Sequence, residues 1–458
     1  MIHAHVHAKF TEGPIFRHVL TMLSTSALSL LTVFMVDILT LIYVSRLGDQ
    51  SMLAALGLAK TLIFINGAVG SGMVIAAGVI LSQSIGRHAA RKQSRLVTHM
   101  LLLAFVIGAA LAGVEGLCMA QIARWLTIDA QVYRAAQDFI WLALPSSVLS
   151  AIMQMCAEML RTRGHARLAL AVVLSGAVTL GLADPLFIFG LKMGLMGAGL
   201  SYFLSASVSL ITGLVFVKRR IGLSTSVNLK LFGLHSRYTL RVALPIMLSS
   251  LAMPVGITYL ITVLSGFGAS ALAGMAVIDR ALQIGYCAFF ALPSALVPVI
   301  AQNLGAGLDA RARRAIIAAA KLVVTYAGAY WLLLNLSGQL IPDYVGLTGT
   351  GRDMFMVFAH YGAGLWIVLG LDFVGQSMFL TMGRTWWLAA FSWARGTLGT
   401  IPFVFVGGHW FGGGEVMLGL WTGNALVSLA IIAAACWNAR QYFRQRAILL
   451  PVALHQVP

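Results

Sequence analysis

The chain alternates long apolar stretches with short polar ones, which is typical of a protein that crosses a membrane many times. About 20 apolar residues in a helix cross the roughly 30 Å of hydrocarbon in a bilayer. Several stretches are longer, which predicts tilted helices or helices that extend beyond the bilayer. Twelve membrane-spanning helices are expected near residues 18–44, 52–81, 96–120, 133–157, 167–190, 195–217, 241–266, 271–300, 316–338, 354–381, 386–406 and 415–437.

The second half of the chain repeats the first half with an offset of about 219 residues. Gln83 matches Gln302, and Gly164 matches Gly383, at this same offset. Six spans per copy is an even number, so both copies enter the membrane in the same direction, as a parallel repeat. The substrate site of such transporters lies between the halves. We therefore expect two six-helix repeats that form a V-shaped central cavity.

The repeat divides the chain into five parts. The distribution of basic residues predicts which of these parts face the cytoplasm. Most of the 31 Lys and Arg residues fall in gaps that share one side if both termini are cytoplasmic, as the positive-inside rule predicts. The parts are a cytoplasmic tail (1–17), an N-lobe (18–217), a cytoplasmic linker (218–240), a C-lobe (241–437) and a second cytoplasmic tail (438–458).

Composition excludes a soluble protein and a nucleic-acid-binding protein. The chain is 59% hydrophobic and 10% charged, whereas soluble domains carry about 25% charged residues. The net charge of +17 is explained by the basic gaps between spans. No P-loop occurs, so ATP is not the evident energy source, and the four cysteines lack metal-ligand spacing. We expect no enzyme activity, no cofactor and no bound metal.

Three acids within the expected spans are candidates for ion coupling, because a charge at the centre of a span costs at least about 2.5–3.5 kcal/mol. Asp37 lies in an apolar stretch with no basic residue within one helical turn. A carboxyl group in such surroundings tends to take up a proton, as a proton-coupled carrier requires. Asp184 precedes Pro185, which should break its helix locally and free backbone carbonyls for a cation. Asp372 lies in the tenth span.

Other charged residues in the spans are interpreted as structural. Asp279 and Arg280 are adjacent in sequence and point about 100° apart on a helix, so each is expected to pair across helices. Lys60 lies near the outer end of its span, from which it can extend to the membrane surface. Arg395 is expected to pair with a carboxylate.

Several motifs together resemble the multidrug and toxic compound extrusion (MATE) family, over essentially the whole chain. They are MVDILTLIYVSRLGDQSMLAALGLA in the first two spans, ADPLFIFGLKMGLMGAGLS in the fifth and sixth, ALPIMLSS opening the seventh, and VPVIAQNLGAGLDARARRA closing the eighth. The resemblance implies a secondary antiporter that exports organic, often cationic, compounds in exchange for protons or sodium by alternating access.

The resemblance also assigns roles to individual residues. Asp37 and Asp184 match N-lobe acids implicated in ion coupling, and Asp372 matches a C-lobe acid used in some members. Met253 stands where some members have Glu. Leu180 and Tyr202 stand where members with an N-lobe alkali-ion site tend to have Asn and Thr. These departures weaken a sodium site and leave a proton site intact, and the expected ion-coupling or substrate residues are Asp37, Asp184, Asp372 and Tyr202.

Two alternatives to proton-coupled drug export remain open. One is sodium-coupled export, for which Asp184 and its loosened carbonyls are the candidate site. The other is a lipid-linked oligosaccharide flippase of the same superfamily, although the deep basic residues that a pyrophosphate would need are few. A non-transporting scaffold is disfavoured by the repeat and the intramembrane acids. The expected partners are small organic substrates and the lipid bilayer of the cell membrane, around a monomer.

Overall fold

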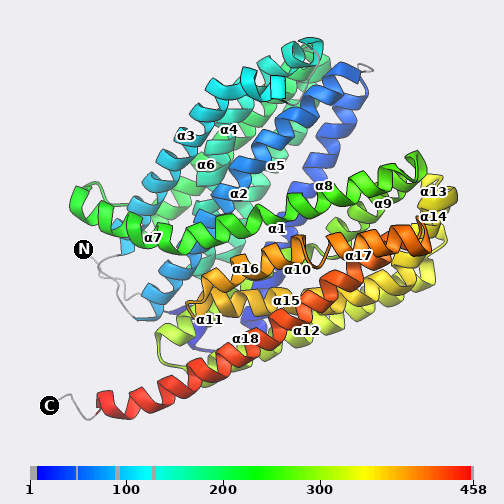
Figure 1. Cartoon of the computed structure of the whole chain (residues 1–458). Helices are drawn as coiled ribbons and strands as arrows, with labels where there is room; N and C mark the ends of the chain where they lie inside the picture. The colour runs from blue at the N-terminus through cyan, green and yellow to red at the C-terminus, as the bar shows by residue number, and fades with distance from the viewer. Residues whose placement is uncertain (1–7, 48–49, 88–92, 126–129, 455–458) are drawn as a thin grey trace. The chain divides into compact units, whose positions relative to one another are not determined.

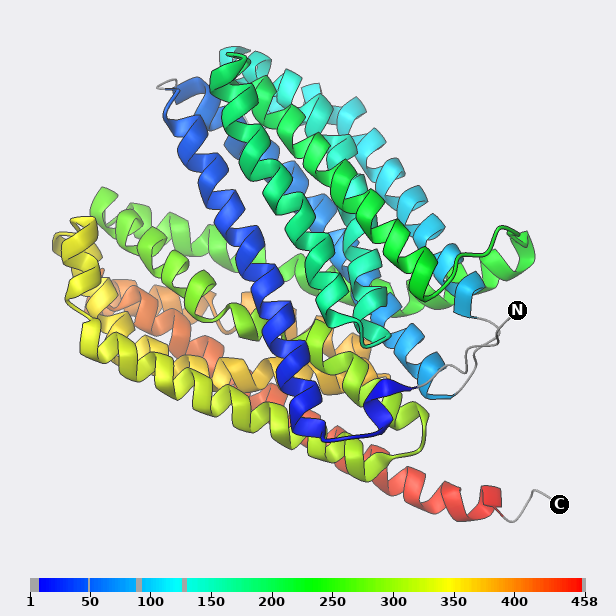
Figure 2. The same cartoon turned by 180° about the vertical axis from the view of Figure 1, so that it is seen from behind.

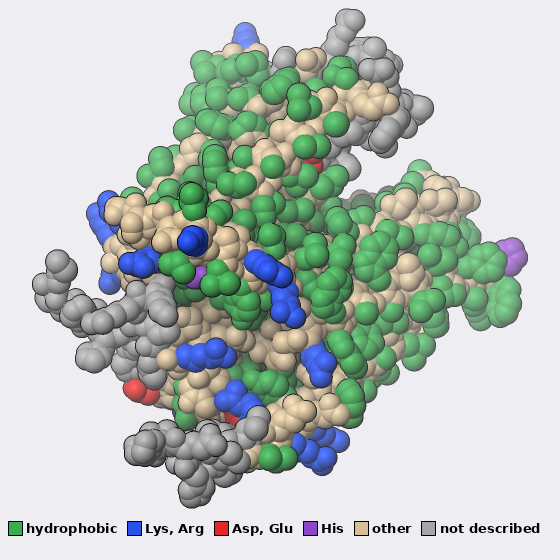
Figure 3. All heavy atoms as spheres, turned by 60° about the vertical axis from the view of Figure 1, so that its left-hand side comes forward, with side chains coloured by type: hydrophobic (Ala, Val, Ile, Leu, Met, Phe, Trp, Pro, Cys, Tyr) green, Lys and Arg blue, Asp and Glu red, His purple; other side chains and the backbone are tan. Residues whose placement is uncertain are grey.

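The computed structural model describes residues 8–47, 50–87, 93–125 and 130–454, and these residues are almost entirely helical (Figures 1 and 2). Hydrophobic side chains cover much of the surface in Figure 3, as expected for helices surrounded by lipid. The chain divides into two compact units. The first comprises Met1–Lys9 and Ser24–Met247, and the second comprises Phe10–Leu23 and Leu248–Pro458.

The first unit is built around α4 (Ala130–Thr162), which packs against four neighbouring helices. The apolar length of these helices follows from the bilayer thickness, and the glycines between them allow close approach. Gly213 shows this, because a methyl group there would contact Cβ of Cys156 on α4 at 3.0 Å. The other elements are α1 (Ile15–Ser45, from Ser24 onward), α2 (Gln50–Gly86), α3 (Gln93–Trp125), α5 (Ala166–Pro185), the π-helical segment η3 (Leu186–Gly190), α6 (Gly194–Arg220) and α7 (Leu229–Ser250, up to Met247).

The second unit is built around α15 (Ala363–Thr381), which packs against α11, α12, α16 and α18. It contains more short helices than the first unit. The other elements are α8 (Ala252–Ser265), α9 (Ala269–Gly285), α10 (Cys287–Phe290), α11 (Leu292–Gly305), α12 (Asp309–Ser337), α13 (Leu340–Val345), α14 (Gly349–Val357), η4 (Phe358–Gly362), α16 (Thr385–Gly396), α17 (Ile401–Val406), η5 (Gly407–Phe411) and α18 (Val416–Leu454).

Two of the expected spans consist of helical pieces that are each too short to cross a membrane. The span expected at 271–300 is divided among α9, α10 and α11, and the span expected at 386–406 is divided between α16 and α17. Pro293 and Pro402 stand at the start of α11 and α17, where a missing backbone N–H ends the preceding hydrogen-bond ladder. For this reason ten helices within the described residues, rather than twelve, are individually long and apolar enough to cross a membrane.

Candidate functional site

A cavity of about 460 Å³ lies within the first unit, among α1, α2, α4, α5 and α6. Its walls are largely apolar, with a small group of polar side chains. This combination is typical of small-molecule sites, in which apolar walls give affinity and a few polar groups fix orientation. Asp37, Thr40, Gln154, Tyr202 and Ser205 are among the polar residues of the lining.

Asp37 and Thr40 reach the cavity together because they stand three residues apart on α1, and residues at this spacing share a helix face. Tyr202 reaches the cavity from α6. Its hydroxyl forms a hydrogen bond with Ser150 and lies within electrostatic range of Asp37. Two of the residues singled out from the sequence, Asp37 and Tyr202, are therefore neighbours.

Asp184 joins this group through Thr40. The Thr40 hydroxyl donates a hydrogen bond of 2.6 Å to Asp184 Oδ2, which links α1 to α5. Asp184 is 1% exposed, and its Oδ1 atom has no hydrogen bond of ordinary geometry within the described part of the chain. Ser201 on α6 interacts with the same carboxyl group. The acid therefore has one oxygen held by Thr40 and a second oxygen able to take a proton or a cation.

The local break predicted at Pro185 is present. Helix α5 ends at Pro185, and the chain continues in the wider π-helical turn of η3. In this turn the N–H of Leu191 donates to the carbonyl of Leu186 at 2.8 Å, five residues back. Proline cannot donate a hydrogen bond, and a π-turn accommodates the resulting shift of register. Asp184 thus occupies the last regular turn of its helix.

Leu180 also lines the cavity, four residues before Asp184. Its side chain is apolar and contributes no oxygen to the wall at the position where the family resemblance implies an Asn in members with an alkali-ion site. Tyr202 contributes a single hydroxyl, already engaged with Ser150. Leu180 therefore supplies no oxygen ligand for a cation at this part of the cavity wall.

Asp372 lies in the second unit, away from this cavity. It is fully buried and accepts hydrogen bonds from Gln376 and Ser428, each at 3.1 Å, and from Arg395, with which it forms an ion pair. The expectation that Arg395 pairs with a carboxylate is confirmed. The pair joins α15 to α16, and Ser428 adds α18.

The pairing expected for Asp279 and Arg280 is wrong in one respect. Within the described residues neither bonds across helices; both interact with Gln283 on their own helix, α9. Arg280 donates to Gln283 Oε1 and Gln283 Nε2 donates to Asp279 Oδ2, each at 2.7 Å. A glutamine three and four residues away on the helix can reach both charges at once. The side chain of Lys60 lies outside the described residues.

Two buried acids were missed in the sequence. Glu115 on α3 is 5% exposed and accepts a hydrogen bond from Asn66 on α2. Glu158 on α4 is 1% exposed and pairs with Arg161 at 3.3 Å. Glu115 stands in an apolar stretch, so the criterion that identified Asp37 would have found it. The first contact joins α2 to α3, the second lies within α4, and neither acid is among the residues that line the cavity.

Comparison with known proteins gives a consistent family match. The sequence model of the MatE family matches residues 25–183 and 245–406. The two segments begin 220 residues apart, which agrees with the internal repeat. The chain is 23% identical over 335 residues to the FAD transporter of Shewanella oneidensis, covering 72% of this chain and 74% of that protein. It is 22% identical to the multidrug export protein MepA of Staphylococcus aureus, covering 92% and 93%.

Solved structures share the fold at low sequence identity. A mutant of the Vibrio cholerae MATE transporter VcmN superposes with a TM-score of 0.87 at 19% identity, covering 94% of this chain and 98% of that one. A transporter of the MOP superfamily from Pyrococcus furiosus superposes with a TM-score of 0.86 at 18% identity, covering 95% and 98%. This likeness confirms the predicted layout of twelve helices in two repeats.

Proposed function

Because the chain belongs to the MatE family, we propose that it is a secondary active exporter of small organic compounds, cationic or amphipathic, in exchange for protons by alternating access. The observation that carries the proposal is the polar group of the first-unit cavity, in which Asp37, Thr40 and Tyr202 line the wall and Thr40 bonds the buried Asp184 behind it. The similarity to a multidrug export protein supports the same substrate class.

The arrangement of the two acids supports proton coupling. Asp37 faces the cavity, and Thr40, one turn further along the same helix, bonds Asp184. Two carboxylates in one low-dielectric site repel each other, and a proton on either one removes the repulsion. An organic cation entering the cavity competes with that proton for the same negative charge. Exchange of proton for cation is then the lowest-energy way to keep the site neutral.

The driving force is sufficient for such an exchange. A pH difference of one unit supplies about 1.4 kcal/mol per proton. A membrane potential of 100 mV adds about 2.3 kcal/mol per charge moved. We infer a cell-membrane location with both termini in the cytoplasm, because the basic gaps between spans then face the cytoplasm. In this orientation protons would move into the cytoplasm as the substrate moves out of it.

A flavin dinucleotide is a second candidate substrate. The FAD transporter of Shewanella oneidensis is as similar to this chain as the multidrug exporter is. The first-unit cavity, at about 460 Å³, falls within the range of about 300–1,000 Å³ that accommodates drug-sized ligands. The acids of this cavity disfavour a bound pyrophosphate, so an organic cation remains the first choice.

The test is transport by the purified full-length protein in proteoliposomes, with ethidium as the cationic probe. We expect export under a pH gradient without sodium, and none under a sodium gradient with the pH gradient collapsed. Asp37→Asn should abolish the export that the pH gradient drives, while Asp353→Asn, an exposed acid of α14, should leave it unchanged. Export that requires sodium, or that survives in Asp37→Asn at wild-type rates, would refute the proton mechanism.

A further inference from the structure

A pair of histidines joins α3 to the start of α7 within the first unit. His99 Nδ1 and His235 Nδ1 lie 2.9 Å apart, and the ring centroids lie 5.0 Å apart. Neither histidine is among the residues that line the first-unit cavity. Because a hydrogen bond needs one nitrogen with a hydrogen and one with a lone pair, one Nδ1 donates to the other.

The linker that precedes α7 also rests on α3. The N–H of Ser224 donates to Thr98 Oγ1 at 2.9 Å. Phe232, one turn before His235, packs edge-on against the His99 ring with centroids 5.6 Å apart. The first turns of α3 are therefore the surface on which the linker and the start of α7 are docked.

The first turns of α7 lie largely on the protein surface apart from this contact. Leu229 is 81% exposed and Leu234 is 63% exposed. Lys230 and Arg237 are exposed as well. His99, by contrast, is 1% exposed. Its ring is thus a buried point of attachment for a helix end that is otherwise exposed.

Burial decides which of the two rings donates. His99 Nε2 is buried and has no hydrogen-bond partner within the described residues. A neutral ring carries one hydrogen, so if His99 donates from Nδ1, its Nε2 bears only a lone pair. The opposite tautomer would bury an N–H group without an acceptor, which is unfavourable. His99 is therefore the donor, and His235 Nδ1 is the acceptor.

The pair in this form has no place for a further proton. On His235 the proton would occupy Nδ1, the atom that accepts the hydrogen bond, because Nε2 already carries a hydrogen. On His99 it would occupy Nε2, for which the described part of the chain provides no acceptor. The charged group that acts on His99 is Arg95, and a protonated ring beside it would be repelled. The docked arrangement therefore requires both rings to be neutral.

We propose that His99 and His235 form a pH-sensitive latch, which holds the start of α7 on α3 while both rings are neutral and releases it when the pair takes up a proton. The inference goes beyond the proposed function, because the latch lies outside the cavity and requires neither a substrate nor an ion gradient.

The size of the effect follows from the titration of imidazole. A ring with the ordinary pKa of about 6.5 changes from roughly 10% to roughly 90% protonated between pH 7.5 and pH 5.5. A docked state that excludes one proton is therefore weakened about tenfold over this range, and one that excludes two protons about a hundredfold. Docking is lost as the pH falls, because the released rings bind protons that the docked rings do not.

The test is hydrogen–deuterium exchange of the purified full-length protein in detergent, read by mass spectrometry of peptides from residues 222–240. Exchange at pH 7.5 and pH 5.5 is compared after correction for the intrinsic rate at each pH. We expect the protection of this segment to fall about tenfold to a hundredfold at pH 5.5. Peptides from the middle of α4 should stay protected, which separates release of the latch from unfolding of the unit.

His235→Asn is the decisive variant, because the asparagine oxygen stands near the position of Nδ1, accepts a hydrogen bond and does not titrate. The segment should then stay protected at pH 5.5. His235→Ala removes the acceptor and should leave the segment weakly protected at both pH values. His165→Gln removes another histidine of the first unit and, as the matched control, should keep the wild-type fall.

Three results would overturn the proposal: equal protection of the segment at both pH values in the wild type, a fall that survives in His235→Asn, or an equally large fall in α4. None of these measurements involves transport. Failure of proton-coupled export would therefore leave the latch standing, and failure of the latch would leave the proposed export standing.

Discussion

Thr40 and Asp184 are 144 residues apart in the sequence and joined by a hydrogen bond of 2.6 Å. Thr40 lines the first-unit cavity, whereas Asp184 is buried behind it. The hydroxyl is thus the link between an acid that faces the cavity, Asp37, and one that does not. This relationship makes Thr40 as relevant to coupling as either acid.

Replacing Thr40 by valine should impair proton-coupled export several-fold while preserving the fold. Valine has nearly the same shape but cannot donate to Asp184, so the buried carboxylate loses its hydrogen bond. The measurement is the initial rate of ethidium export at several pH gradients. Thr32→Val is the control on the same helix, because Thr32 bonds only the backbone carbonyl of Leu28. Equal effects of the two substitutions would show that the Thr40 link has no special role.

Removing one partner of the buried ion pair between Asp372 and Arg395 should strongly lower the stability of the protein. Asp372 is fully buried and the Arg395 side chain is 24% exposed. Arg395→Ala should lower the free energy of unfolding by about 3–5 kcal/mol, since it strands a buried carboxylate. Adding Asp372→Leu should recover much of the loss. Thermal unfolding in detergent measures both effects.

The exposed pair of Arg352 and Asp343 provides the comparison for this prediction. Its nitrogen and oxygen lie 2.5 Å apart, but the two side chains are 39% and 55% exposed. Arg352→Ala should therefore cost about 0–1 kcal/mol, because solvent screens the interaction. A similar loss for both pairs would contradict the role of burial.

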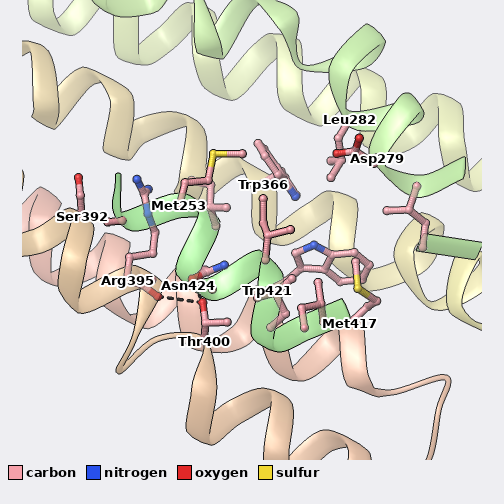
Figure 4. A pocket seen from close by; sticks show the side chains of 18 of the residues that line it. Met253, Asp279, Leu282, Trp366, Ser392, Arg395, Thr400, Met417, Trp421 and Asn424 are labelled. Atoms are coloured by element: carbon pink, nitrogen blue, oxygen red, sulfur yellow. Dashed lines mark hydrogen bonds between the residues drawn. The ribbon is translucent and has the colours of Figure 1, made fainter. Parts of the chain in front are cut away.

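Gly362 closes η4 directly against Trp421, which lines a cavity of about 250 Å³ in the second unit (Figure 4). A methyl group at this position would overlap the indole ring. Gly362→Ala should destabilise the protein by about 1–3 kcal/mol, as overpacked sites do. Gly328→Ala on α12 meets no described atom within 4 Å and should be neutral or stabilising by about 0.5–1 kcal/mol. Unfolding midpoints of the two variants test the contrast.

His165, between α4 and α5, should make stability depend on pH. Its pKa is lowered from 6.5, first by burial away from water and then by the positive charges of Arg220, Lys9 and Arg163. Below pH 6.5 the unfolded chain takes up a proton that the folded state resists. Stability is therefore lost as the pH falls from about 6.5 toward the lower folded-state value.

His165→Gln should flatten this dependence between pH 7.5 and pH 5, as seen in unfolding midpoints. His409→Gln, which removes an exposed histidine of η5, serves as the control and should keep the wild-type slope. An unchanged slope in His165→Gln would assign the pH dependence to other groups.

The sequence by itself determined the class of the protein, its repeat and the residues to examine. Bilayer thickness sets the length of an apolar span, and the repeat recurs at a constant offset, so both are readable without coordinates. The cost of intramembrane charge singled out Asp37, Asp184, Asp372 and Arg395 before any contact was known. Proline chemistry likewise predicted the break after Asp184, which the η3 turn confirms.

Only the tertiary structure decided which of these residues meet. Sequence spacing specifies neighbours on one helix, as with Asp37 and Thr40, but the register between helices depends on side-chain packing along their whole length. That register places Thr40 against Asp184 and Arg395 against Asp372. It also places His99 of α3 against His235 of α7. Contacts between distant helices depend on how the side chains pack, and the spacing of residues along the sequence does not specify them.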